Sequence, residues 1–141
     1  MLLDQVTKGM ATAHLQYGIP WPVIPGFNLT LLHNTGAAFS LLDDAAGWQR
    51  WMFTGIALVV SVIIVFWMRQ LEARDRLALA ALALILGGAL GNVIDRLRLG
   101  YVVDFIQWYY QQWSWPAFNI ADSAIFVGVI VLIFHKPTAE S

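Results

Sequence analysis

Two long uncharged segments constrain the fold of this chain more than any other feature. Residues 51–68 read WMFTGIALVVSVIIVFWM and residues 77–94 read LALAALALILGGALGNVI, and neither contains Asp, Glu, Lys or Arg. At about 1.5 Å per residue, either segment as a helix extends about 27 Å, close to the roughly 30 Å thickness of a bilayer's hydrocarbon core. We therefore predict two transmembrane helices, over about 51–68 and about 77–97.

A third apolar segment near the C-terminus completes the predicted helical fold. Residues 118–134, FNIADSAIFVGVIVLIF, carry Asp122 as their one charge, and we expect a third span over about 118–135. The composition agrees, because 59% of the 141 residues are hydrophobic and only 12% are charged, against about a quarter in soluble domains. The short polar connection RQLEARDR, residues 69–76, makes the first two spans antiparallel neighbours. The predicted fold class is mainly α, a polytopic membrane protein built as an antiparallel transmembrane helix bundle.

The region before the first long span has a different character. Gly and Pro recur in YGIPWPVIPGF, residues 27–32 alternate loosely in polarity, and HNTGA supplies turn residues. We expect residues 20–47 to form a surface β and short-helix element on the membrane, with helical turns over 37–42.

The distribution of Lys and Arg gives only a weak prediction of orientation, because equal numbers fall on the two sides of the predicted spans. Three arginines in the connection 69–76 favour a cytoplasmic position for that loop. The aromatic segment FIQWYYQQWSW, residues 105–115, then lies at the outer interface, where amphipathic rings concentrate.

Several chemistries are excluded by the residues present. The absence of cysteine removes disulfides and thiolate nucleophiles, and a net charge of −1 without a basic cluster argues against nucleic acid as a partner. The three histidines are scattered and lack metal-ligand spacing, and phosphate-binding glycine loops are missing, so we expect no metal and no cofactor. The glycine cluster GGALG, residues 87–91, is instead typical of close helix packing.

Polar residues in the apolar segments are candidates for function because they are costly at membrane depth. On a helix, Asn119, Asp122 and Ser123 share a face, and Asn92, Asp95 and Arg96 do the same by three- and four-residue spacing. For Asp95 and Arg96 we expect a buried ion pair that holds helices together.

Asp104 and Asp122 admit more than one interpretation. Arg96 or Arg98 can neutralise one of them, or the two carboxyl groups can share a proton and act as acid and base in an aspartic peptidase. A small proton- or cation-coupled membrane transporter subunit is the alternative from another class, because membrane carboxylates also carry ions.

Five ordered motifs give a more specific hypothesis. The sequence contains DQVTK, HNTGAAFS, GNVIDR, VVDF and FNIADS in that order, separated by apolar helices. This series resembles lipoprotein signal peptidase, the bacterial type II signal peptidase. The resemblance implies an inner-membrane, multi-pass aspartic endopeptidase whose active site faces the periplasm. Its partners would be membrane lipids and diacylglyceryl-modified lipoprotein precursors, cleaved before the lipidated cysteine, and we expect a monomer.

The resemblance also assigns residues. It makes Asp104 and Asp122 the catalytic pair, and it gives a site-shaping or substrate-binding role to Asp4, Lys8, Asn34, Gly36, Asn92, Asp95, Arg96, Asn119 and Ala121. Members of the family have a complete transmembrane helix before DxxTK, whereas three residues precede Asp4 here. We therefore expect residues 1–8 to be the end of a truncated first helix, within a single membrane-embedded peptidase domain over residues 1–141.

Overall fold

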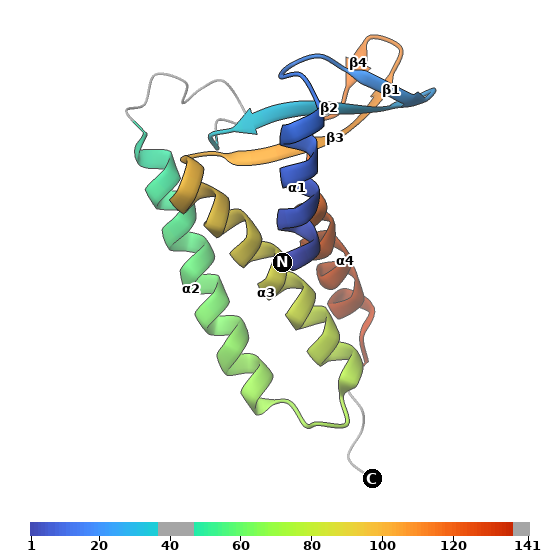
Figure 1. Cartoon of the computed structure of the whole chain (residues 1–141). Coiled ribbons are helices and arrows are strands. Elements are labelled where there is room, and N and C mark those ends of the chain that lie inside the picture. The colour runs from blue at the N-terminus through green and yellow to red at the C-terminus, as the bar shows by residue number, and fades with distance from the viewer. Residues whose placement is uncertain (37–46, 137–141) are drawn as a thin grey trace.

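Four helices lie beneath a four-stranded antiparallel sheet in the computed structural model, which describes residues 1–36 and 47–136 (Figure 1). In chain order the elements are α1 (Leu2–His14), β1 (Trp21–Ile24), β2 (Phe27–Asn34), α2 (Trp48–Gln70), α3 (Arg76–Leu99), β3 (Val102–Tyr110), β4 (Trp113–Ser114) and α4 (Ile120–Phe134). The sheet caps one end of the helices, and the α2–α3 connection lies at the other end. The helical turns predicted over 37–42 lie outside the described residues.

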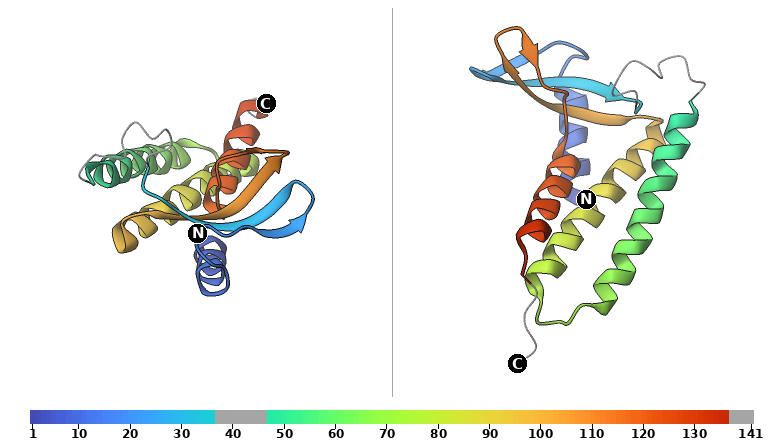
Figure 2. Two further views of the ribbon diagram at one scale, coloured as in Figure 1. Left: turned by 90° about the horizontal axis from the view of Figure 1, so that it is seen from above. Right: turned by 180° about the vertical axis from the view of Figure 1, so that it is seen from behind.

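The two long uncharged segments form the helices α2 and α3, and both are long and apolar enough to cross a membrane. Each helix extends past the predicted bounds of its uncharged segment. Large apolar side chains of α2, including Val59 and Ile63, are more than half exposed in the isolated chain, as expected for a surface that meets lipid. Helix α3 lies between α2 and α4 (Figure 2).

The third apolar segment forms a shorter helix than predicted. Helix α4 has 15 residues, about 22 Å of length, and starts at Ile120 instead of residue 118. Its start is set by Asn119, which caps the helix from an extended conformation, and by Phe118, whose backbone bonds to Ile106 of β3. The third membrane span therefore stays a prediction.

Helix α1 continues to His14, six residues beyond the predicted end at Lys8. The additional turns are held by tertiary packing, because Ala11 is buried in a cluster with Leu31, Val103 and Phe105 beneath the sheet. The helix therefore connects the sheet to the upper parts of α3 and α4 (Figure 1).

The sheet is larger than the predicted surface element. Strands β1 and β2 fall inside residues 20–47, but β3 and β4 come from residues 102–114, where the sequence indicated the VVDF motif and interfacial aromatic residues but no strand. Strand β2 pairs antiparallel with β3, and the ring of Phe27 stacks on Trp108 with centroids 4.9 Å apart. This pairing sets Leu32 opposite Asp104 and so fixes the place of Asp104 above the helices.

Glycines allow α3 and α4 to approach each other closely. A Cβ atom on Gly88 would collide with the carbonyl oxygen of Ala121, and one on Gly128 would lie 2.6 Å from the carbonyl oxygen of Ala81. Within the glycine cluster 87–91, Gly88 therefore has the predicted packing role between α3 and α4. Its counterpart on α4 is Gly128.

We expect Gly88→Ala and Gly128→Ala to lower stability by about 1–3 kcal/mol each, because backbone atoms of the neighbouring helix must move away. The measurement is the thermal unfolding midpoint in detergent. Gly55→Ala on α2 is the matched control, since nothing lies within 4 Å of a Cβ at that position. Equal midpoints for all three variants would contradict the close-packing account.

Candidate active site

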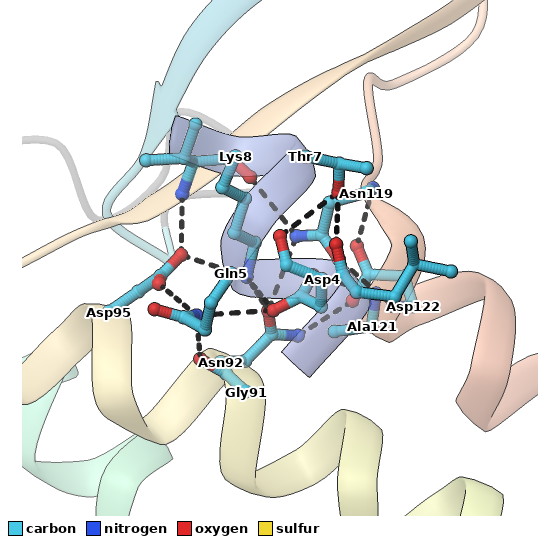
Figure 3. A network of polar contacts seen from close by, with 12 residues as sticks. Asp4, Gln5, Thr7, Lys8, Gly91, Asn92, Asp95, Asn119, Ala121 and Asp122 are labelled. Carbon is cyan, nitrogen blue, oxygen red and sulfur yellow. Dashed lines mark hydrogen bonds and ion pairs between the residues drawn. The ribbon is translucent and has the colours of Figure 1, made fainter. Parts of the chain in front are cut away.

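A cluster of buried polar residues lies where α1, α3, α4 and β3 meet (Figure 3). Six of its side chains belong to residues that are at most 7% exposed, namely Asp4, Lys8, Asn92, Asp95, Asp104 and Asn119. Burial of so many polar groups is tolerated only when each one has hydrogen-bond partners.

The Lys8 ammonium group is the centre of this cluster. Its Nζ lies 2.9 Å from Asp4 Oδ2, 2.8 Å from Asp95 Oδ2 and 2.9 Å from Asn92 Oδ1. An ammonium group has three N–H donors, so these three acceptors use all of them. Lys8 is paired with Asp4 one helical turn away on α1, and its buried ion pair with Asp95 thus links α1 to α3.

The predicted ion pair between Asp95 and Arg96 is wrong. Asp95 binds Lys8, accepts a hydrogen bond of 2.9 Å from Gln5 Nε2, and accepts one of 3.0 Å from the Val103 backbone N–H. The guanidinium of Arg96 lies instead over the ring of Phe53, 5.5 Å from its centroid. Adjacent residues of a helix point in different directions, so Asp95 and Arg96 face different neighbours.

Asn119 joins the start of α4 to both catalytic candidates. Its Oδ1 accepts from the Asp122 backbone N–H at 2.9 Å, and Asp122 Oδ2 accepts from the Asn119 N–H at 3.3 Å, which together form a capping box. Asn119 Nδ2 donates to Asp104 Oδ1 at 2.7 Å. Asn119 and Asp122 are therefore neighbours through the cap and not, as predicted, through a shared helix face.

All four carboxyl oxygens of Asp104 and Asp122 accept an N–H donor. Asp104 Oδ2 accepts from Asn34 Nδ2 at 3.1 Å, and Asp122 Oδ1 accepts from Asn92 Nδ2 at 2.8 Å. Burial first, and then the negative charge of Asp122, raise the pKa of Asp104 to about 7. The site thus combines two neighbouring carboxyl groups, one of which holds a proton near neutral pH.

The remaining predicted residues lie around this pair. Gly36, with φ of 95°, donates its N–H to Asn34 Oδ1 at 2.8 Å, and Ala121 donates its N–H to Asp4 Oδ1 at 2.9 Å. Arg96 forms no ion pair within 4 Å in the described part of the chain, although its charge acts on Asp122, Asp104 and Asp95.

Gln5 was missed by the sequence analysis, whereas Gly91 belongs to the glycine cluster 87–91 that was predicted to allow close packing. Gln5 Nε2 donates to Asp4, Asp95 and the Gly91 carbonyl oxygen. Gly91 itself must lack a side chain, because a Cβ there would lie 2.6 Å from Asp4 Oδ2. Gln5 stands inside the motif DQVTK, but only the contact between α1 and α3 shows that it faces the cluster.

An apolar cavity of about 560 Å³ opens beside Asp122. The segment before α4 and one face of α4 line it, with Trp115, Pro116, Ala117, Phe118, Ser123, Phe126 and Val127 as the other lining residues. A carboxyl group at the edge of an apolar cavity is suited to act on a bound apolar substrate.

Long apolar helices, a capping sheet and a buried carboxyl pair are typical of a membrane enzyme, and comparisons with known proteins agree. A solved bacterial membrane enzyme, determined by the in meso method at 1.9 Å resolution, is 34% identical with a TM-score of 0.83, over 97% of this chain and 88% of its own. A second such structure at 2.3 Å has 32% identity and a TM-score of 0.81, over 99% and 88% of the two chains.

The family is defined by sequence. Residues 1–136 match the family described as signal peptidase (SPase) II. The lipoprotein signal peptidase of Acinetobacter baylyi is 58% identical over 94% of this chain and 74% of its own length, and that of Polynucleobacter necessarius is 54% identical over 96% and 83%. The chain belongs to the signal peptidase II family, and it is therefore a peptidase.

The geometry around Asp95 predicts that Asp95→Ala is more destabilising than Arg96→Ala. Loss of the Asp95 carboxylate leaves the Val103 N–H without its acceptor, takes away one of the three acceptors of Gln5 Nε2 and removes one of the two anions of Lys8, which should cost about 3 kcal/mol. Arg96→Ala removes a cation–π contact worth about 0.5–1 kcal/mol. Unfolding midpoints of the two variants measure the difference, and a larger loss for Arg96→Ala would contradict this assignment.

Proposed function

We propose that this chain is an aspartic endopeptidase of the bacterial inner membrane that removes signal peptides from diacylglyceryl-modified lipoprotein precursors, cleaving before the lipidated cysteine. Asp104 and Asp122 are the catalytic residues. The observation that carries the proposal is the convergence of both carboxyl groups on Asn119, through its side-chain amide and its backbone N–H, in a member of the signal peptidase II family.

The proposed reaction needs one ionised and one protonated carboxyl group. Asp122 takes a proton from water as the water oxygen bonds to the scissile carbonyl carbon, and Asp104 gives its proton to the carbonyl oxygen. The carbon–nitrogen bond then breaks, the leaving nitrogen takes the proton held by Asp122, and a hydroxyl proton of the intermediate returns to Asp104. The products are the free signal peptide and a lipidated cysteine with a free amine.

The location of the pair suits a substrate anchored in lipid. Asp104 lies on β3 of the sheet and Asp122 in the first turn of α4, at the sheet end of the helices (Figure 1). With the bilayer around the helices, a membrane-anchored segment would reach this end from the lipid and water would reach it from the side of the sheet. The apolar cavity beside Asp122 offers room for apolar parts of the precursor. The three arginines in residues 69–76, at the opposite end, favour the cytoplasm for that end and the periplasm for the active site.

The direct test is cleavage of a lipidated precursor by the purified protein in detergent or lipid. We expect Asp104→Asn and Asp122→Asn each to reduce turnover by at least about 1,000-fold while precursor binding persists, since an amide keeps the shape but cannot exchange the proton. The matched control is Asp75→Asn at the far end of α3, where Asp75 caps the helix and bonds to His135. Cleavage retained in either active-site variant would refute the catalytic pair.

The pH dependence supplies an independent test. Asp104 must be protonated to act as the acid, and its pKa is raised to about 7, so the fraction of active enzyme falls as the pH rises through that value. We expect kcat to decline above about pH 7. A kcat that stays level to pH 9, measured with chemistry as the slow step, would remove Asp104 from the acid role.

A further inference from the structure

Lys8 contacts more than its two carboxylate partners. Through Asn92 it reaches Asp122, because Asn92 Oδ1 binds the ammonium group and Asn92 Nδ2 binds the carboxylate. We propose that Lys8 is a positioning residue that fixes the orientation of the Asn92 amide and thereby makes Asp122 the ionised member of the pair, the base that activates water. This inference rests on the proposed function, since it assigns the roles within that pair.

The first step of the argument is the orientation of the amide. Asn92 Oδ1 accepts from Lys8 at 2.9 Å and from Asn119 Nδ2 at 3.2 Å. If the amide were flipped, its NH₂ group would face an ammonium group and another NH₂ group, so that donors would meet donors. The Asn92 side chain is buried, so water does not compensate for such a mismatch. Only one orientation satisfies these groups.

The second step is the consequence for Asp122. With Asn92 fixed, Asp122 Oδ1 receives an N–H donor at 2.8 Å, while the backbone N–H of Asn119 occupies Oδ2. Hydrogen bonds donated to both oxygens favour the charged form of a carboxyl group. A flipped Asn92 would present its oxygen to Asp122, and only a protonated Asp122 could satisfy that contact.

Asp104 lacks this restraint at one of its two oxygens. Its Oδ1 accepts from the buried Asn119 amide at 2.7 Å, but its Oδ2 accepts from Asn34, which is exposed at the end of β2. The side-chain donor to Asp122, Asn92, is buried and held by the Lys8 ammonium group. The charged groups that act on Asp122 oppose one another, because Lys8 of α1 and Arg96 of α3 are cations while Asp4 of α1 and Asp104 of β3 are acids. The anchored amide therefore distinguishes the two carboxyl groups.

The test compares the pH profile of kcat/KM for Lys8→Met, Asn92→Ala and the control Gln5→Leu. Gln5 donates to the same two acids as Lys8 but makes no hydrogen bond to Asn92 in the described structure. We expect the acid limb, where the base must be ionised, to move up by about one pH unit in Lys8→Met and Asn92→Ala. We expect Gln5→Leu to lower the unfolding midpoint without moving that limb.

Asn92→Ala keeps the inference testable if Lys8→Met does not fold, because it leaves Lys8 paired with Asp4 and Asp95. If Asn92→Ala folds but is too slow for a pH profile, infrared difference spectra replace the kinetics. The protonated carboxyl band that is missing in Asp122→Asn identifies Asp122, and it should persist to higher pH in Asn92→Ala than in the parent.

An unmoved acid limb, or an unmoved Asp122 band, in folded Asn92→Ala would overturn the inference, as would an equal shift in Gln5→Leu. These results are separable from failure of the proposed function. Cleavage retained by Asp104→Asn or Asp122→Asn would remove the catalytic pair itself. Inactive Asp variants combined with an unmoved limb would leave the peptidase in place and reject only the role of Lys8.

Discussion

The rest of the structure depends on the buried ammonium group of Lys8. It binds two carboxylates, from α1 and α3, and an amide that leads to α4, so one side chain connects three helices. A buried charge is stable only when its partners are complete, because an unpaired ion in a medium of low polarity is strongly unfavourable. Each contact therefore restricts the positions of the helices, and the helices in turn place the carboxyl groups of Asp104 and Asp122.

Small residues make this arrangement sterically possible. Gly91 admits the Asp4 carboxylate to the surface of α3, and Gly88 allows the first turn of α4 to approach the same helix. Asn119 then converts this contact into a site, because the residue that starts α4 also donates to Asp104 on β3. Helix capping, close packing and the alignment of the two aspartates are three consequences of one junction, which explains why so many polar groups are buried in so small a volume.

Much of this site could be predicted from the sequence because its motifs are ordered and specific. All the residues assigned by resemblance except Arg96 share a side-chain hydrogen bond or ion pair with another of them in the described structure, and the uncharged segments form helices near the predicted bounds. The errors came where a residue's partner is distant in the chain. Asp95 has a cation as its next residue but binds Lys8, 87 positions away, and strand β3 pairs with residues of β2 that lie 68 to 81 positions earlier.

Local chemistry thus determined what each segment is, and tertiary structure determined which groups meet. In a bilayer, the length and apolarity of residues 51–68 and 77–94 require helices, because a helix bonds its backbone N–H and C=O groups to one another. Three features depend on how α1 packs against α3 and β3. They are the direction of the Gln5 side chain, the choice of Lys8 as the cation that Asp95 binds, and the orientation of the Asn92 amide. Sequence spacing records neighbours along one helix, whereas a buried hydrogen bond forms between whichever donors and acceptors packing brings together.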